Sequence, residues 1–117
     1  MIRQNVCVLA IFAAITVCTS SARAATQFDG PWKMRFITLT GPCNPFYNVK
    51  GQIIDGSIQY GGVSGRVTPS GVLSATVTFG STRGSGAGRL SKASGNGIWR
   101  AQLPNGPCNG TWSAQRD

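Results

Sequence analysis

Few residues of this chain could carry out acid–base or nucleophilic chemistry. The 117 residues include no histidine and no glutamate, and the only carboxylate side chains are Asp29, Asp55 and Asp117. Histidine is the usual general base and the commonest metal ligand, so both roles lack their ordinary candidate. Asp29 and Asp55 each precede a glycine, a position where an aspartate side chain bonds its own backbone. We predict that these two residues form turns rather than an acid–base pair.

Other catalytic or cofactor motifs are weak or missing. The segment Gly84-Ser85-Gly86-Ala87-Gly88 superficially resembles a phosphate loop, but the Lys-Ser/Thr pair of that motif does not follow it. The serines have no candidate base beyond the lysines, and a metal site fails for want of ligands. The sequence therefore predicts a protein that is not an enzyme and that needs neither a metal nor another cofactor.

The N-terminus has the three parts of a secretory signal in order. Arg3 supplies the positive charge, residues 6–17 form an uncharged apolar segment, and Ala22-Arg23-Ala24 is an Ala-x-Ala cleavage site. We predict a signal peptide at residues 1–24, a single mature domain at residues 25–117, and a periplasmic or secreted location. The alternatives are a buried core helix or uncleaved anchor, and a lipoprotein cleaved before Cys18.

Cleavage would remove two of the four cysteines and leave Cys43 and Cys108. Both stand in Gly-Pro-Cys-Asn tetrapeptides, which are typical of turns. An even pair of cysteines in an oxidising compartment predicts a disulfide bond.

The mature region has the pattern of an all-β protein. Short runs of alternating apolar and polar residues are separated by Gly, Pro, Asn and Asp. The expected strands are 32–39, 46–54, 57–60, 63–68, 72–79, 83–91, 96–102 and 108–116. We predict an antiparallel meander of about eight strands closed into a barrel, with a two-sheet sandwich as the alternative.

Three Gly-x-Trp tripeptides end at Trp32, Trp99 and Trp112, which all face inward in the predicted strands. One interpretation is a stacking platform for a sugar or an aromatic ligand. We favour a structural core in which the tryptophans face the row of glycines at 84, 86 and 88, which would admit large side chains from opposite strands. Arg116 would stack on an indole and close one end of the barrel.

The mature region carries nine Lys and Arg residues against three Asp, a net charge of +6. Six of these cations are expected on outward-facing positions: Lys33, Arg35, Arg66, Arg83, Arg89 and Arg100. They predict a surface for an anionic polymer or an acidic protein, unless they only keep the protein soluble. They form no run and have no exposed aromatics between them, which disfavours a specific nucleic-acid site. Strands such as residues 57–60 are also far shorter than a membrane-spanning barrel needs, which disfavours that class.

The chain carries a recurring motif set: Phe28-Asp29-Gly30-Pro31-Trp32, Cys43, Gly95-Asn96-Gly97-Ile98-Trp99, and Cys108-Asn109-Gly110-Thr111-Trp112-Ser113-Ala114-Gln115-Arg116. This pattern, FDGxW … C … GxGxW … CxGxWxAxR, resembles a group of small exported alphaproteobacterial proteins of unknown function. The resemblance implies a β-barrel-like domain and export, and it implies no activity.

These observations favour an exported, non-catalytic module that binds an anionic envelope or extracellular partner through its surface. Two other functions stay open. A lipocalin-like carrier of a small ligand would need an open cavity inside the barrel. An inhibitor of an exported enzyme would need an exposed loop, for which residues 41–48 and 103–107 are the candidates.

Overall fold

The computed structural model describes residues 25–117, and the predicted signal peptide at residues 1–24 lies outside the described residues. The strands are β2 (Gly30–Thr40), β3 (Phe46–Ile54), β4 (Ser57–Tyr60), β5 (Val63–Val67), β6 (Val72–Phe79), β7 (Thr82–Leu90), β8 (Ser94–Leu103) and β9 (Gly106–Arg116). Across residues 25–117, the structure has no helix with the length and apolar character needed to cross a membrane.

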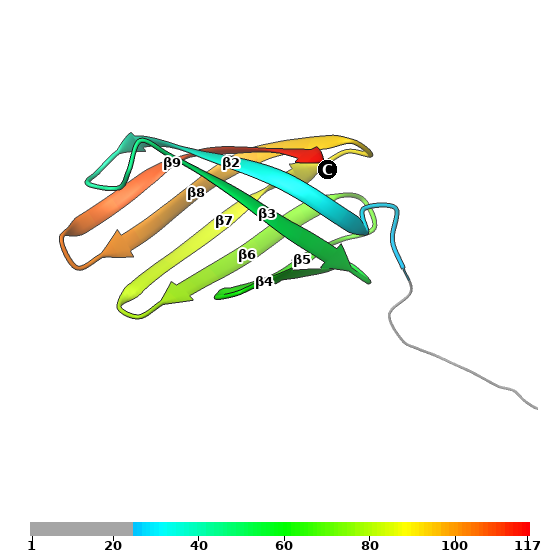
Figure 1. Ribbon diagram of the computed structural model, residues 1–117, viewed down its shortest axis with the longest axis horizontal. Helices are drawn as coiled ribbons and strands as arrows, with labels where there is room; N and C mark the ends of the chain where they lie inside the picture. Colours follow the sequence, from blue (N-terminus) through cyan, green and yellow to red (C-terminus); the bar gives the residue numbers. More distant parts are fainter. Residues whose placement is uncertain (1–24) are drawn as a thin grey trace, which may run out of the picture.

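The eight strands form one closed barrel (Figure 1). Each strand pairs antiparallel with the next one, and β9 pairs with β2 to complete the circle. The predicted barrel is therefore confirmed, and the alternative sandwich is not formed. Residues point alternately into the barrel and out to solvent along the strands, apart from a β-bulge between Thr38 and Thr40 in β2.

The turn between β3 and β4 is held from outside by the N-terminal segment. Asp55 and Gly56 both have positive φ, +51° and +78°, as a two-residue hairpin turn requires. Their amides donate to the Asp29 carboxylate over 2.7 and 3.1 Å, and the Thr26 hydroxyl donates to it over 2.7 Å. We expected Asp29 to bond its own backbone, but its amide partners belong to this separate hairpin. Asp29 thus joins two parts of the chain.

This carboxylate should make stability depend on pH in the acid range. The Thr26 hydroxyl and the amides of Asp55 and Gly56 hold the pKa of Asp29 below its usual 3.8, against an opposing effect of burial. A lowered folded pKa stabilises the fold above the usual pKa, and this contribution disappears as the pH falls through the folded value. Thermal unfolding should therefore show that wild type is more stable than Asp29→Asn near neutral pH and that the difference shrinks below about pH 4. A difference that stays constant with pH would contradict this role.

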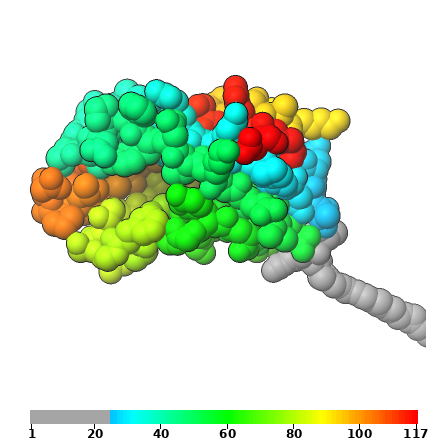
Figure 2. Space-filling model, in the orientation of Figure 1, coloured from blue at the N-terminus to red at the C-terminus, as the bar shows by residue number. Residues whose placement is uncertain are grey.

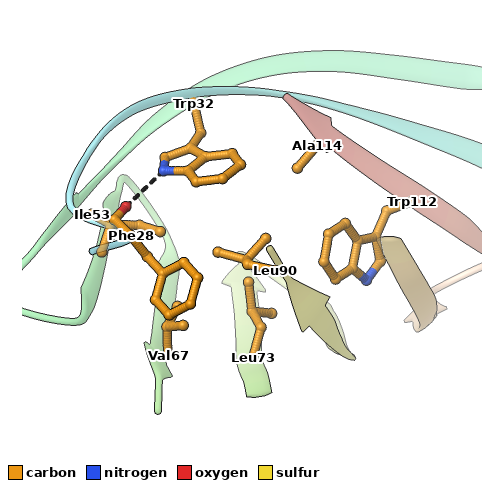
Figure 3. Close-up of a cluster of buried hydrophobic side chains, with 8 residues drawn as sticks. All are labelled: Phe28, Trp32, Ile53, Val67, Leu73, Leu90, Trp112 and Ala114. Atoms are coloured by element: carbon orange, nitrogen blue, oxygen red, sulfur yellow. Dashed lines mark hydrogen bonds between the residues drawn. The ribbon is translucent and has the colours of Figure 1, made fainter. Parts of the chain in front are cut away.

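The barrel is packed solid at one end. Figure 3 shows the eight buried side chains of this core: Phe28, Trp32, Ile53, Val67, Leu73, Leu90, Trp112 and Ala114. Phe28 precedes the first strand and is 2% exposed, so the N-terminal segment itself plugs this end. The Trp32 indole N–H donates to the Phe28 carbonyl over 2.8 Å, which fixes the plug to β2.

Arg116 completes the closed end. Its guanidinium lies 4.7 Å from the centroid of the Trp32 ring, so the expected stacking on an indole is present. The same group donates to the carbonyls of Asp29 and Gln27 over 2.7 and 2.6 Å, and to that of Lys92 over 3.0 Å. One side chain thereby joins the last strand, the N-terminal segment and the β7–β8 turn.

Glycines on neighbouring strands make room for the buried indole of Trp112. A Cβ atom at Gly88 or Gly97 would lie 2.6 or 2.7 Å from the Trp112 ring, closer than real side chains allow. These glycines are on β7 and β8, and Trp112 is on the adjoining β9. The indole therefore lies flat over adjacent strands, whereas we expected the glycines to admit side chains from the opposite wall.

Candidate functional site

The interior of the barrel is filled at the closed end only. There, the inward-facing Leu73 and Trp112 are 4% and 2% exposed. Two and four residues farther along β6, the inward-facing Ala75 and Val77 are only half-buried. Apolar side chains stay accessible inside a barrel only where their neighbours leave space. This space is a cavity of about 460 Å³.

The cavity wall is almost entirely apolar. The inward-facing residues that line it are Met34, Phe36, Tyr47, Val49, Gly51, Ile58, Tyr60, Val63, Leu73, Ala75, Val77, Phe79, Thr82, Gly84, Gly86, Trp99, Ala101, Leu103 and Trp112. Arg100 also borders the cavity, but it stands at an outward-facing, exposed position of β8. A charged ligand group would lose its hydration in such a site without gaining a partner. The lining therefore suits an apolar molecule.

Trp99 presents an apolar face to this cavity. Its ring meets Phe36 edge-on, with 6.3 Å between centroids and 77° between planes. The indole N–H donates to the carbonyls of Ile37 and Thr111 over 3.2 and 3.0 Å. Because this donor already has partners in the wall, only the aromatic surface is free for a ligand.

The cavity opens where the strands of the closed barrel are shortest. Strand β3 pairs with β2 over residues 46–53 but with β4 only over residues 52–54, and β4 and β5 have just four and five residues. Figure 2 shows the surface hollowed between the β2–β3 connection, the β6–β7 turn and the β8–β9 turn. Tyr47, Tyr60 and Phe79 line this side of the cavity and are 37%, 41% and 52% exposed. The mouth is thus aromatic.

A disulfide bond fastens the connection between β2 and β3 at the open end. It joins Cys43 in that connection to Cys108 on β9, with 6.1 Å between their Cα atoms. The two loops considered for an inhibitor, residues 41–48 and 103–107, lie side by side next to this bond, since a Cβ atom at Gly106 would touch Pro42. The bond restrains the part of the barrel that has the least internal packing.

The six predicted surface cations lie on different parts of the outer surface of the barrel. Lys33 and Arg35 line a shallow pocket on the outer face of β2, β3 and β9, and Arg35 stacks on Phe46 at 4.5 Å. Lys33 is paired with Lys50 on the neighbouring strand β3, so this pocket is basic. Arg89 is exposed on β7 and borders neither this pocket nor the groove described next.

Arg66, Arg83 and Arg100 share a different site. All three line a broad groove that crosses the outer face of the strands from β4 to β9. Their side chains are at exposed positions of β5, β7 and β8. The structure therefore brings together half of the cations that the sequence indicated, and it separates the rest from them.

Of the residues that line the cavity, the sequence singled out Trp99, Trp112 and the glycines at 84 and 86, and alternation placed Leu73, Ala75, Val77 and Phe79 on the inner face. The alternation of residues along a strand identifies which side chains face the interior, but it does not distinguish a filled interior from a hollow one. Within residues 25–117, no cluster of three His, Cys, Asp or Glu side chains is present that could hold a metal ion.

Comparison of the chain with protein-family models, with curated proteins and with solved structures found no match. The cavity and the groove are therefore interpreted from their own chemistry.

Proposed function

We propose that this protein is a non-catalytic carrier or binding protein that holds a small apolar ligand inside its barrel. The observation that carries this proposal is the cavity of about 460 Å³ behind the aromatic mouth. Binding pockets for small molecules are usually about 300–1,000 Å³ and mainly apolar, with few polar groups.

The ligand class follows from the wall. The inward-facing lining contains no charged side chain, so a ligand is bound mainly by removal of apolar surface from water. Tyr47 and Tyr60 line the cavity at its exposed side and carry phenol groups, which suits a ligand with one weakly polar end. We expect an uncharged, largely hydrocarbon molecule.

The location that we propose is outside the cytoplasm. The Cys43–Cys108 bond is consistent with an exported protein, because such bonds persist in oxidising compartments. A carrier of apolar molecules has a clear use there, since such molecules cross water poorly without one.

Filling the cavity should abolish binding and leave the fold intact. Val77 faces inward and is paired with Gly84, whose missing side chain leaves room for a larger neighbour. We expect wild type to bind the neutral fluorophore phenylnaphthylamine, with increased dye emission and reduced Trp99 emission. Val77→Trp should weaken dye binding at least about tenfold, because a ring in the cavity removes the space that the dye needs.

The matched control is Thr78→Trp, which adds the same ring at the next, outward-facing position of β6. It should bind the dye as wild type does. Thermal unfolding would verify that both variants fold. Equal dye binding by folded Val77→Trp and wild type, or no binding by wild type to any apolar probe, would contradict the proposal.

A further inference from the structure

The outer groove carries positive charge, which has no part in the binding of an apolar ligand inside the cavity. Arg66, Arg83 and Arg100 line it, and its lining includes no aspartate from the described residues. Within residues 25–117, the only ion pair joins Lys50 to Asp117 on another wall, so the three guanidinium groups have no carboxylate partner there. The groove is thus a concave surface with uncompensated positive charge.

The strand register arranges polar side chains in a line across this groove. Ser64 is paired with Thr76, Thr76 with Ser85, Ser85 with Arg100, and Arg100 with Asn109. All five residues are outward-facing and line the groove. Because neighbouring strands are about 4.8 Å apart, the line crosses five strands over roughly 19 Å. It offers hydroxyl, guanidinium and amide groups at regular intervals.

Two other arginines flank this line on opposite sides. Arg83 lies two residues from Ser85 along β7, and Arg66 lies two residues from Ser64 along β5. Arg83 is paired with Gln102, which is two residues from Arg100, so these two cations are diagonal neighbours on adjacent strands. A chain lying along the polar line would have a cation within reach on either side.

We infer that this groove binds an extended acidic polysaccharide. Sugar hydroxyls would bond to the line of short polar side chains, and the carboxylates or sulfates would pair with Arg66, Arg83 and Arg100. The large hydrophobic side chains exposed in the groove are the aliphatic Leu39 and Ile98, so it offers no exposed aromatic platform on which successive nucleic-acid bases would stack. The concave, linear shape suits one chain rather than the face of a folded protein.

The test uses the disulfide-bonded chain and polygalacturonate, which carries a carboxylate on each sugar. Calorimetry at low ionic strength should detect binding to polygalacturonate but not to neutral dextran, and added salt should weaken it. Arg66→Gln/Arg83→Gln, at two groove positions that do not line the cavity, should bind roughly fivefold to thirtyfold more weakly, because it loses two solvent-exposed ion pairs.

The matched control is Lys33→Gln/Arg89→Gln, which removes the same charge from exposed positions outside the groove. It should keep most of the affinity. Thr76→Trp, at an outward-facing position of the polar line that does not line the cavity, should reduce binding without any change of charge, because its ring would obstruct the line. Phenylnaphthylamine binding should be unchanged in all three variants, which separates this site from the cavity and verifies that each variant folds.

Several outcomes would overturn the inference. Equal losses in the two charge-matched variants would mean that only the overall positive field attracts the polymer. Equal binding of dextran would remove the role of charge. Tighter binding of single-stranded poly-dT or of polyglutamate would assign the groove to a nucleic acid or an acidic polypeptide instead.

Discussion

Replacing Cys43 and Cys108 with alanine should lower the free energy of unfolding by about 4 kcal/mol. The bond joins residues 65 apart in the chain, so it removes much conformational freedom from the unfolded state. In a domain of this size the melting temperature should fall by roughly 16–30 °C. Thermal unfolding followed by circular dichroism would measure the change.

Reduction provides an independent form of the same experiment. Wild type with a strong reductant should unfold near the temperature of the double variant, and the double variant should not respond to the reductant. Cys43→Ser/Cys108→Ser shows whether the change of side chain matters, since Cys108 is only 1% exposed. A melting temperature of wild type that does not move on complete reduction would contradict the expected role.

The position of the bond predicts where the structure loosens. The buried core lies at the closed end, whereas the bond attaches the β2–β3 connection at the open end. Hydrophobic packing can hold the first region without help, but the hollow half has fewer contacts to lose. Apolar-dye affinity should therefore decrease in the double cysteine variant even at temperatures where its barrel remains folded.

Trp112→Ala should destabilise the barrel by about 3–5 kcal/mol, the usual range for removal of a buried aromatic side chain. The Trp112 ring is 2% exposed, and its N–H donates to the Ala87 carbonyl over 3.2 Å. Its loss removes apolar burial and also leaves Gly88 and Gly97 facing an empty space that no side chain of their own can fill. Urea unfolding would measure the loss.

The same contact can be disrupted from the other side. Gly97→Ala would place a Cβ atom 2.7 Å from both the Trp112 ring and the Gly88 Cα atom, and closer still to the Ala87 carbonyl oxygen. We therefore expect a loss of about 3 kcal/mol from clashes with the backbone of β7 and with the indole together. The control is Gly51→Ala, at an inward-facing glycine of β3, where the nearest atom to the new Cβ would be 3.9 Å away. Equal stability of the two glycine variants would contradict the proposed packing of indole on glycine.

The two halves of the interior have complementary roles. The closed half, with Phe28, Trp32 and Trp112, supplies the packing that keeps the barrel folded. The other half can then remain hollow, because its stability comes from strand pairing, from the disulfide bond and from continuity with the core. A cavity at the open end lowers the stability of the fold, and proteins tolerate such a loss where binding requires the space.

Much of the fold was readable from local patterns. Alternation in residues 72–79 predicts a strand with one inner face, and Asp55-Gly56 predicts the hairpin turn, because both signals depend on neighbouring residues alone. The strand ranges agree with the structure to within two residues. The stacking of Arg116 on an indole also followed from alternation, which placed it on the inner face with the tryptophans.

The sequence by itself determined the class of fold, the inner and outer residues and the pairing of Cys43 with Cys108. Only the tertiary structure decided that the interior is half hollow, because the position of each indole depends on glycines of neighbouring strands. Only the register between strands decided that Ser64, Thr76, Ser85, Arg100 and Asn109 form one line and that Lys33 and Arg89 lie elsewhere. Alternation tells which face a residue occupies, whereas cavities and surface sites depend on which residues from distant segments become neighbours.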